Sequence, residues 1–302
     1  MGAQEWNHVG AGMKALFITP FIHDQCPLVA AWNSWNEPAT HKTFNVWDEP
    51  NDESILQIVR DTTPDVIFYV GGNAGKGLPS FETFRDLRNL APLIHLCWDA
   101  TDSAWHATLT EYKKYECFNL QVAMDGGTDS PVDMATLTPC DPRPYERSSD
   151  VRNIRCAFAG QNVNRAFNPI DQHPRWNILM PLVKMKLVKY RRRDNSPYSD
   201  YAAYLKGCQM LLNISHTGSG KAHHVKVRVV EAGFAGCALL EMKQAPTIHW
   251  IPKECLFLYS DVEEAAEIIR SAEIVDKASA LSAYVRDNYS PQRIYESILA
   301  RL

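Results

Sequence analysis

A glycine-rich loop followed by a helical pattern is the part of the chain best suited to binding an anionic ligand. The loop contains Gly218, Ser219 and Gly220, and the helical pattern extends from 225 to 235. Backbone N–H groups at the start of a helix lack intrahelical acceptors, and the helix dipole adds positive potential there. We therefore expect this loop to hold a diphosphate at the helix N-terminus.

Two ionisable side chains on the same helix could complete such a site. Arg228 and Glu231 are three residues apart, so they share one helix face. A guanidinium can bind phosphate oxygens through parallel hydrogen bonds, and a carboxylate can accept from both hydroxyls of a ribose. Taken alone, the same pair is also typical of a solvated helix face. The residues around it must decide between the two interpretations.

The surroundings of this pair resemble a known family. The string Arg228-x-x-Glu231-Ala232-x-x-Ala235-Gly236, followed by an apolar strand, resembles the donor-site motif of the group 1 glycosyltransferases, in particular of the branch named after spore maturation proteins. Further segments lie in the order that this branch shows, namely 158–160 with Arg165 shortly after, 201–215 and 256–269. The resemblance covers about half of the chain and is loose in the N-terminal half.

The resemblance implies an α/β protein of the GT-B fold, in which two Rossmann-like domains face each other across a cleft. It implies a nucleoside-diphosphate sugar of the UDP or GDP type as donor, bound mainly by the C-terminal domain, and no other cofactor. The N-terminal domain would bind the hydroxyl acceptor, such as a glycan or a protein. Transfer would need no metal, and a retaining outcome is favoured. A nucleotide-sugar epimerase of the same fold and a non-catalytic nucleotide-sugar-binding module remain alternatives.

The resemblance also assigns donor contacts residue by residue. Glu231 would bind the ribose, and Arg228 would bind the diphosphate together with Lys226 or Arg165. Gly160 would lie at the turn after the first C-terminal strand. Positive side chains and a helix dipole would then stabilise the leaving diphosphate.

One position departs from the pattern of the family. Many relatives carry a second carboxylate eight residues before the ribose-binding one, where this chain has His223 beside His224. His223 is therefore our candidate for the catalytic contact with the sugar, since an imidazole can donate to a hydroxyl or a phosphate near neutral pH. We expect His224 to join the donor site and the loop 218–220 to close over the diphosphate. The two histidines could equally lie on a loop surface.

The N-terminal half offers one catalytic candidate. Asp99 follows the apolar run 93–98, and open α/β sheets place functional groups at the carboxyl ends of their strands. Asp99 could orient the acceptor hydroxyl or accept its proton. A strand-end aspartate is about as often a helix cap, and Asp102 competes for either role. The glycine-rich loop 71–77, after the preceding strand, suits a close approach to a ligand.

Short apolar runs alternate with helical patterns, which predicts βαβ units and largely parallel sheets. The expected N-terminal elements are strands at 15–19, 44–47, 65–70, 93–98 and 119–123, with helices at 52–60 and 81–90. A polar stretch at 126–151 is interpreted as an interdomain linker. The expected C-terminal elements are strands at 154–159, 185–190, 209–213, 238–241 and 256–259, with helices at 170–183, 199–206, 225–235 and 262–271.

The last part of the chain, 275–302, is helical in pattern apart from a break at 288–291. We expect this tail to cross back and pack on the N-terminal domain. The predicted division is 13–145 for the acceptor domain, 151–285 for the nucleotide-sugar-binding domain and 286–302 for the crossing helix.

Composition limits the compartment and the partners. The 302 residues carry a formal net charge of −4 with a pI near 6.2, which gives no general attraction to nucleic acid or anionic lipid. Eight cysteines without metal-ligand spacing fit a reducing cytoplasm and do not indicate zinc. No stretch approaches the ~18 apolar residues of a membrane span. Neither glycine loop has the spacing of a Walker motif, so phosphoryl transfer is disfavoured.

Overall fold

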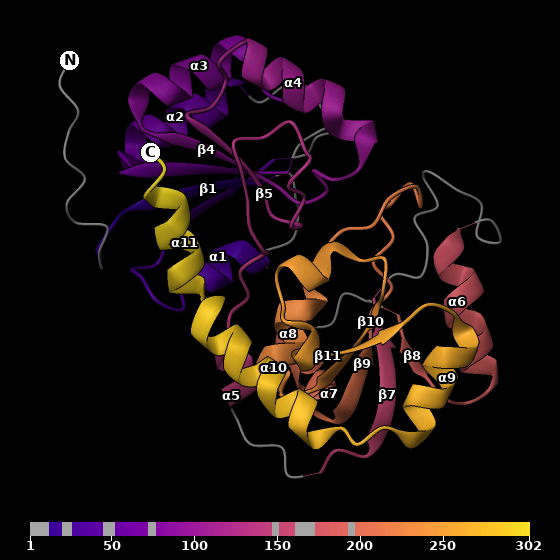
Figure 1. Cartoon of the computed structure of the whole chain (residues 1–302). Coiled ribbons are helices and arrows are strands. Elements are labelled where there is room, and N and C mark those ends of the chain that lie inside the picture. Colours follow the sequence, from indigo (N-terminus) through magenta and orange to yellow (C-terminus); the bar gives the residue numbers. More distant parts are fainter. Residues whose placement is uncertain are drawn as a thin grey trace.

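Two runs of strands and helices form the chain, one in each half (Figure 1). The structure is a computed structural model that describes residues 12–19, 26–44, 52–71, 77–146, 151–160, 173–192 and 197–302. The N-terminal strands are β1 (Ala15–Thr19), β2 (Thr40–Thr43), β3 (Val66–Val70), β4 (Leu93–Cys97), β5 (Leu120–Ala123) and β6 (Met134–Ala135). The helices of this half are α1 (Pro27–Trp32), α2 (Asp52–Thr62), α3 (Phe81–Leu90) and α4 (His106–Lys114).

Burial on both faces explains the apolar character of the N-terminal strands. Every residue of β1, β3 and β4 is buried, as expected for parallel strands that helices cover on both sides. The strands predicted at 15–19, 65–70, 93–98 and 119–123 are confirmed to within one residue at either end. Helix α3 begins where predicted because the Ser80 hydroxyl accepts the Thr83 N–H at 3.1 Å.

The predicted strand at 44–47 is wrong in position. The structure places β2 at Thr40–Thr43, whose residues are partly exposed and mostly polar. This strand lies at the edge of the sheet beside β1. An edge strand does not require an apolar run. The apolar pattern therefore predicted this strand a few residues too late in the chain, from Phe44. Residues 45–47 lie outside the described ranges.

The second half repeats the pattern. Its strands are β7 (Ile154–Ala159), β8 (Lys189–Arg191), β9 (Cys208–Leu212), β10 (Ala238–Met242) and β11 (Leu256–Tyr259). Its helices are α6 (Pro174–Lys184), α7 (Tyr198–Lys206), α8 (Arg228–Ala235) and α9 (Val262–Ser271). The predictions for β7, β9, β10, β11, α7 and α9 are confirmed to within one residue.

Three C-terminal predictions need correction. The strand predicted at 185–190 is the shorter β8, and α6 begins only at Pro174, after His173 as its N-cap. Residues 170–172 lie outside the described ranges. The helix predicted from 225 begins at Arg228, and the Val225 N–H before it donates to the Asp125 carbonyl of the other half at 2.8 Å.

Both sheets follow one strand order. The N-terminal sheet reads β2-β1-β3-β4-β5-β6 and the C-terminal sheet reads β11-β10-β9-β7-β8. Counted separately within each half, both orders are 2-1-3-4-5, and β6 extends the first sheet. The strand order reverses between β1 and β3 and between β7 and β9. Open α/β sheets bind ligands outside the carboxyl ends of the strands at such points.

The stretch predicted as a linker at 126–151 is more than a connection. It contributes β6 to the N-terminal sheet and the short helix α5 (Arg143–Glu146). Within it, Leu137, Cys140 and Tyr145 are buried in the core of the C-terminal half, together with Val229 and other residues of that half. The segment therefore ties the two halves together through apolar packing.

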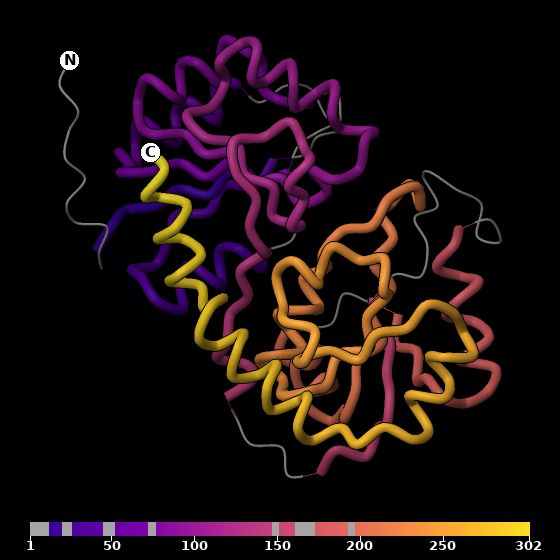
Figure 2. The backbone as a smooth tube through the Cα atoms, in the orientation of Figure 1, coloured from indigo at the N-terminus to yellow at the C-terminus, as the bar shows by residue number. Residues whose placement is uncertain are grey.

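The C-terminal tail crosses back to the first half, as predicted (Figure 2). Helix α10 (Val275–Asn288) packs on the C-terminal half, and α11 (Pro291–Leu299) follows after Ser290, whose hydroxyl caps it. Ile294 and Tyr295 lie in the same core cluster as Phe17. The Tyr295 hydroxyl donates to the Leu28 carbonyl at 2.7 Å. The tail therefore fastens the two halves to each other.

Short 3₁₀ helices lie at Ser103–Trp105, Pro246–His249 and Lys253–Cys255. All eight cysteines are buried and none forms a disulfide bond. Among the helices of the described ranges, none is long and apolar enough to cross a membrane.

Candidate active site

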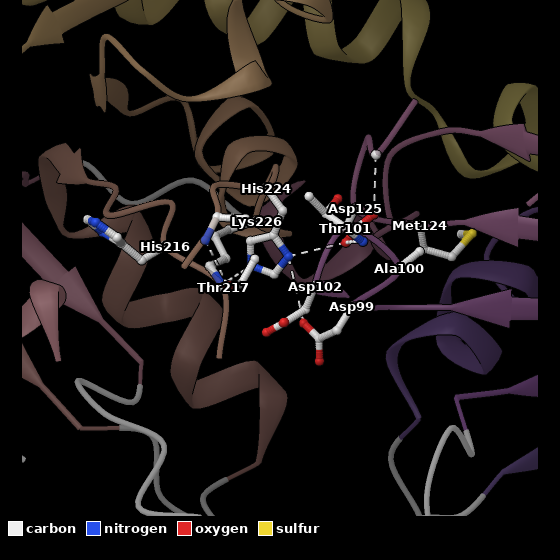
Figure 3. A network of polar contacts seen from close by, with 12 residues as sticks. Asp99, Ala100, Thr101, Asp102, Met124, Asp125, His216, Thr217, His224 and Lys226 are labelled. Carbon is white, nitrogen blue, oxygen red and sulfur yellow. Dashed lines mark hydrogen bonds and ion pairs between the residues drawn. The ribbon is translucent and has the colours of Figure 1, made fainter. Parts of the chain in front are cut away.

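The carboxyl ends of the strands in the two halves lie opposite each other and carry most of the buried polar side chains. Asp99 follows β4 and Asp125 follows β5. Across from them, His224 and Lys226 precede helix α8 (Figure 3). Side chains from both halves therefore meet at the edge where parallel α/β sheets bind ligands.

Arg228 connects the ends of β7 and β9, the point where the strand order of the second sheet reverses. Its Nε donates to the Ala159 carbonyl at 2.9 Å, and its Nη2 donates to the same oxygen. Its Nη1 donates to Asn213 Oδ1 at 2.8 Å. The guanidinium also lies over the Phe158 ring, 4.6 Å from the ring centre, and the residue is buried. Arg228 is thus held at the position where a ligand would bind.

Gly160 makes room for that guanidinium. Its φ of +138° lies in a region that residues with side chains rarely adopt. A Cβ atom at this position would lie 2.5 Å from Arg228 Nη2. The placement of Gly160 at the turn after the first C-terminal strand is therefore confirmed, and the structure explains why a glycine is needed there.

A buried carboxyl group stands behind Arg228. Asn213 Nδ2 donates to Glu241 Oε2 at 2.7 Å, and the same oxygen accepts from the Thr247 hydroxyl at 2.7 Å. Glu241 is fully buried, and this burial raises its pKa although the donors around it and Arg228 act in the opposite direction. The sequence analysis missed Asn213 and Glu241. Both residues could have been predicted from the sequence, because each is a polar residue at the carboxyl end of an otherwise apolar strand.

Glu231 lies in the first turn of α8, as predicted, and tyrosine hydroxyl groups contact its carboxylate. It is 4% exposed, and its two carboxylate oxygens accept from the hydroxyls of Tyr201 at 2.9 Å and Tyr198 at 3.2 Å. The Tyr198 hydroxyl also lies 2.8 Å from that of Tyr145. A carboxylate offers about four acceptor positions in total. The ribose role of Glu231 stays a prediction.

The glycine-rich loop does not lead directly into the helix. His216 and His223 face each other across its base, and residues 221–227 separate Gly220 from α8. The expectation of a loop at the helix N-terminus is therefore wrong in geometry. The loop instead reaches the N-terminal half, where the Ser219 N–H donates to Asp102 Oδ2 at 3.0 Å. Whether the loop binds the diphosphate stays a prediction.

Asp102 has a structural role in this arrangement. Besides Ser219, it accepts the Ala104 N–H at 3.3 Å and so caps a 3₁₀ helix. Burial acts to raise the pKa of Asp102, but these donors outweigh it and leave the pKa below its usual value. Asp102 therefore stays ionised as a contact between the halves, which leaves Asp99 as the candidate for chemistry.

The side chain of Asp99 is about half exposed and lies beside His224 of the other half. Its Oδ1 is 3.7 Å from His224 Nδ1, and its side chain is 52% exposed. The surrounding protein raises the pKa of Asp99 by desolvation, and the charges of Asp125 and Asp102 add to this effect, while Arg175, and His224 when protonated, oppose it. A carboxyl group with a raised pKa beside a cleft is suited to handling a proton.

The two adjacent histidines have different surroundings. His223 Nδ1 lies 3.0 Å from the Ser215 hydroxyl, and its ring packs 4.4 Å from that of His216. Burial lowers the pKa of His223, and the neighbouring His224 adds to this. His223 also lines a cavity of about 120 Å³ with Thr101 and other residues of the N-terminal half. The loop-surface alternative is therefore excluded for His224, which is buried, whereas His223 is partly exposed.

His224 connects charged groups from both halves. Its Nδ1 lies 3.3 Å from Asp125 Oδ2, and its Nε2 contacts Lys226 Nζ (Figure 3). The sequence analysis singled out His224 and Lys226 but missed Asp125. Asp125 could have been predicted from its position after the apolar run that forms β5, where an aspartate precedes two glycines.

Arg175 is a second buried cation that the sequence analysis missed. It lies in the first turn of α6, is 8% exposed and donates from Nη2 to the His216 carbonyl at 2.9 Å. Burial lowers the pKa of Arg175 to about 10, and the charge of Arg228 lowers it further, whereas Asp99 raises it. An anion near both guanidinium groups would relieve their repulsion. Arg165, which we expected at this site, lies outside the described residues.

Within the described ranges, no group of three or more His, Cys, Asp or Glu side chains is arranged to hold a metal ion.

A match to a known protein family identifies the class of enzyme to which this site belongs. Residues 146–300 match the model of a family described as glycosyl transferase-like, and they make up half of the chain. The chain therefore belongs to this glycosyltransferase family and is an enzyme of that class. No curated protein matches the chain.

Solved structures share the fold over nearly the whole chain. HepE from Anabaena, in complex with UDP and glucose, has a TM-score of 0.63 at 11% identity, covering 95% of this chain and 100% of HepE. Sucrose-phosphate synthase from Thermosynechococcus elongatus has a TM-score of 0.61 at 10% identity, covering 95% and 98%. UDP-N-acetylglucosamine 2-epimerase from Rickettsia bellii has a TM-score of 0.51 at 8% identity, covering 95% and 96%. These likenesses concern the fold, which is the GT-B arrangement of two Rossmann-like domains.

Proposed function

We propose that the enzyme transfers a sugar from a nucleoside-diphosphate sugar to a hydroxyl acceptor without a metal ion. The observation that carries this proposal is the buried guanidinium of Arg228 at the carboxyl ends of β7 and β9. Its hydrogen bonds go to a carbonyl and an amide oxygen rather than to a carboxylate. A buried cation with neutral acceptors keeps its positive charge available for an anionic ligand, and a diphosphate is such a ligand.

The other donor contacts follow from the surroundings of Arg228. Arg175 and Lys226 would add positive charge near the diphosphate, and Glu231 would accept the ribose hydroxyls beside Tyr201. UDP is the first nucleotide to test, because HepE has the same fold and is bound to UDP in its crystal structure. GDP is the second.

The main electrostatic task in this reaction is to stabilise negative charge on the leaving diphosphate. In the proposed mechanism Arg228, Arg175 and Lys226 face that charge. Asp99 accepts a hydrogen bond from the acceptor hydroxyl and so orients it, while His223 donates to a hydroxyl of the sugar. We also propose retention of the anomeric configuration, and a closest relation to the spore-maturation branch, both on the motif that begins at Arg228.

A non-catalytic module that binds a nucleotide sugar is the second candidate. Two observations favour it: tyrosine hydroxyls already contact both oxygens of Glu231, and His223 stands where relatives have a carboxylate. Such a module would bind the nucleotide without turnover. An epimerase would need several carboxylates around the sugar ring, and the exposed carboxylates that the described residues place near His223 and His224 include Asp99 and Asp129.

The test is a panel of UDP-, GDP-, ADP- and TDP-sugars with nucleotide release as the readout. We expect release from one donor class, and we expect Arg228→Met to lower it by at least about a hundredfold, because several charge-assisted hydrogen bonds to phosphate are lost. Arg270→Met, on the exposed face of α9, is the matched control and should behave as wild type. Tight nucleotide binding without release would favour the non-catalytic module. An Arg228→Met variant as active as wild type would overturn the site.

A further inference from the structure

His224 joins a carboxylate of one half to an ammonium group of the other. Its Nδ1 faces Asp125 Oδ2 at 3.3 Å, and its Nε2 contacts Lys226 Nζ (Figure 3). The side chains of His224 and Asp125 are only 4% and 2% exposed. Water therefore has little access to the contact between His224 and Asp125. Both interactions use the same imidazole ring, so each one restricts the other.

The chemistry of the two partners determines the tautomer of His224. An ionised carboxylate can only accept hydrogen bonds, so His224 Nδ1 must carry a hydrogen to bind Asp125. An ammonium group can only donate, so His224 Nε2 must be free of hydrogen to bind Lys226. One neutral tautomer, with its hydrogen on Nδ1, satisfies both partners. Asp125 thereby makes Nε2 an acceptor for Lys226.

Asp125 is the carboxylate that dominates this interaction. Backbone N–H groups of Thr101 at 3.0 Å and Gly127 at 3.2 Å donate to it and hold it in place. Asp99 is a second carboxylate near His224 Nδ1, but it is farther away at 3.7 Å and half exposed. Asp102 is bonded to the Ser219 N–H instead.

The position of Asp125 depends on contact between the two halves. Its carbonyl accepts the Val225 N–H at 2.8 Å, and the next carbonyl, that of Gly126, accepts Trp250 Nε1 at 3.2 Å. Gly126 has a φ of +70°, and a Cβ there would lie 2.7 Å from Trp250 Nε1. The turn after β5 is therefore seated directly on the C-terminal half.

We infer that Asp125 is a positioning residue that acts through His224 to hold the Lys226 ammonium for the donor diphosphate. The cation is then in place only when the two halves are in contact. This inference rests on the proposed function and goes beyond it, because it assigns control of donor affinity to a residue of the acceptor half. Asp125 itself touches neither the donor nor the reacting atoms.

The affinity for UDP, measured by calorimetry on the full chain, tests whether Asp125 acts on Lys226 through His224. Lys226→Met should weaken UDP binding by about tenfold to a hundredfold, as expected for the loss of a charged contact with phosphate. Asp125→Asn should weaken it by about fivefold, since a neutral amide oxygen accepts from Nδ1–H more weakly than a carboxylate and fixes the ring and its tautomer less firmly. The double variant should bind within about twofold of Lys226→Met, because the two residues act through one cation.

Additive losses in the double variant, or an unchanged affinity in Asp125→Asn, would overturn the inference. Asp133→Asn is the matched control: this aspartate also pairs with a lysine, Lys113, at 2.7 Å, but it lies within the N-terminal half. It should bind UDP as wild type does. If wild type binds no nucleoside diphosphate, the proposed function fails and the assignment of a donor role to Lys226 fails with it.

A second measurement does not depend on any nucleotide. The ¹⁵N chemical shifts of the His224 ring should show the neutral tautomer with its hydrogen on Nδ1 in wild type. In Asp125→Asn the share of the tautomer with its hydrogen on Nε2 should rise, because the bond to Nδ1–H is weaker, while Asp133→Asn should leave the ring as in wild type. A wild-type ring with hydrogen on Nε2 could not accept from Lys226 and would overturn the inference even if UDP binds.

Discussion

The carboxyl edges of the two sheets differ in how their polar groups are held. At the C-terminal edge, Arg228, Asn213 and Glu241 are buried and bonded to each other and to the Ala159 carbonyl, all within one half. At the N-terminal edge, Asp102 and Asp125 instead bond to residues of the opposite half. The first edge is therefore formed by one half alone, whereas the second is completed only by contact between the halves.

The comparisons with known proteins cover the two halves differently. The family model matches residues 146–300, whereas the likeness to HepE in structure covers 95% of the chain. The C-terminal edge is built from residues between Ala159 and Glu241, all within the stretch that the family model matches. The N-terminal edge combines the ends of β4 and β5 with residues about a hundred positions later, a pattern that a sequence motif cannot express. The predictions below separate the two edges.

The largest effect is expected at Asp99. Asp99→Asn should lower kcat by about a hundredfold or more, because an oriented carboxylate is lost from the acceptor side. The affinity for UDP should not change. Steady-state kinetics and calorimetry measure the two quantities, and the exposed Asp86→Asn on α3 is the control. A parallel loss of UDP affinity would place Asp99 on the donor side and remove the distinction between the edges.

Gly160 should have the next largest effect, on the donor side. A Cβ atom would meet Arg228 Nη2 at 2.5 Å and would sit at a strained φ of +138°. We expect Gly160→Ala to weaken UDP binding by about tenfold and to lower the free energy of unfolding by about 1 to 3 kcal/mol. Gly207→Ala is the control, because the nearest atom to its Cβ is 3.4 Å away. Wild-type UDP affinity in Gly160→Ala would contradict the placement of Arg228 at the diphosphate.

Glu231 provides a finer test of the same edge. Glu231→Gln keeps the size of the side chain beside Tyr198 and Tyr201, so the fold should be retained. It should weaken UDP binding by about fivefold, because bonds between hydroxyls and a carboxylate are stronger than those to an amide. The preference for UDP over 2′-deoxy-UDP should shrink with it. Tyr204→Phe, which removes a hydroxyl bonded to Lys189 instead, is the control. A retained preference would show that another group reads the ribose.

The smallest effect on the donor side is expected from the N-terminal core. His95 is fully buried, its Nε2 donates to the Gly71 carbonyl at 2.8 Å, and burial lowers its pKa from 6.5 to about 4. Between these values the unfolded chain takes up a proton and the folded chain does not, so stability falls as the pH drops from about 6.5 to about 4. The slope contributed is roughly 1.4 kcal/mol per pH unit.

His95→Gln should remove this slope and leave the affinity for UDP unchanged, since an amide N–H can still donate to Gly71. Urea unfolding at several pH values between 4.5 and 7 measures the slope, and the exposed His249→Gln is the control. A changed UDP affinity would mean that the N-terminal core acts on the donor edge, against the separation described above.

Local patterns along the chain determined most of the fold. Apolar runs predicted β1, β3, β4 and β7 because these strands are covered on both faces. Ser290 followed by Pro291 predicted the start of α11 because a cap acts within a few residues. The edge strand β2 was misplaced because its polar residues carry no such pattern.

The candidate site was predictable where its residues are neighbours in sequence. Arg228 and Glu231 share a motif with Gly236, and the structure places both in the first turn of α8. By contrast, the Val225 N–H just before α8 donates to the Asp125 carbonyl, a hundred residues earlier in the chain. A contact between residues so far apart leaves no local pattern in the sequence.

The sequence by itself determined the order of the elements, the family and the donor-side motif, since each depends on residues within one or two turns of each other. The tertiary structure alone decided that Asp125 faces His224, that Asp102 holds the glycine-rich loop and that Arg175 lies near Arg228. Side chains from separate strands and helices meet only when both sheets are folded and in contact. Burial then sets their charges and partners, and no local pattern records that burial.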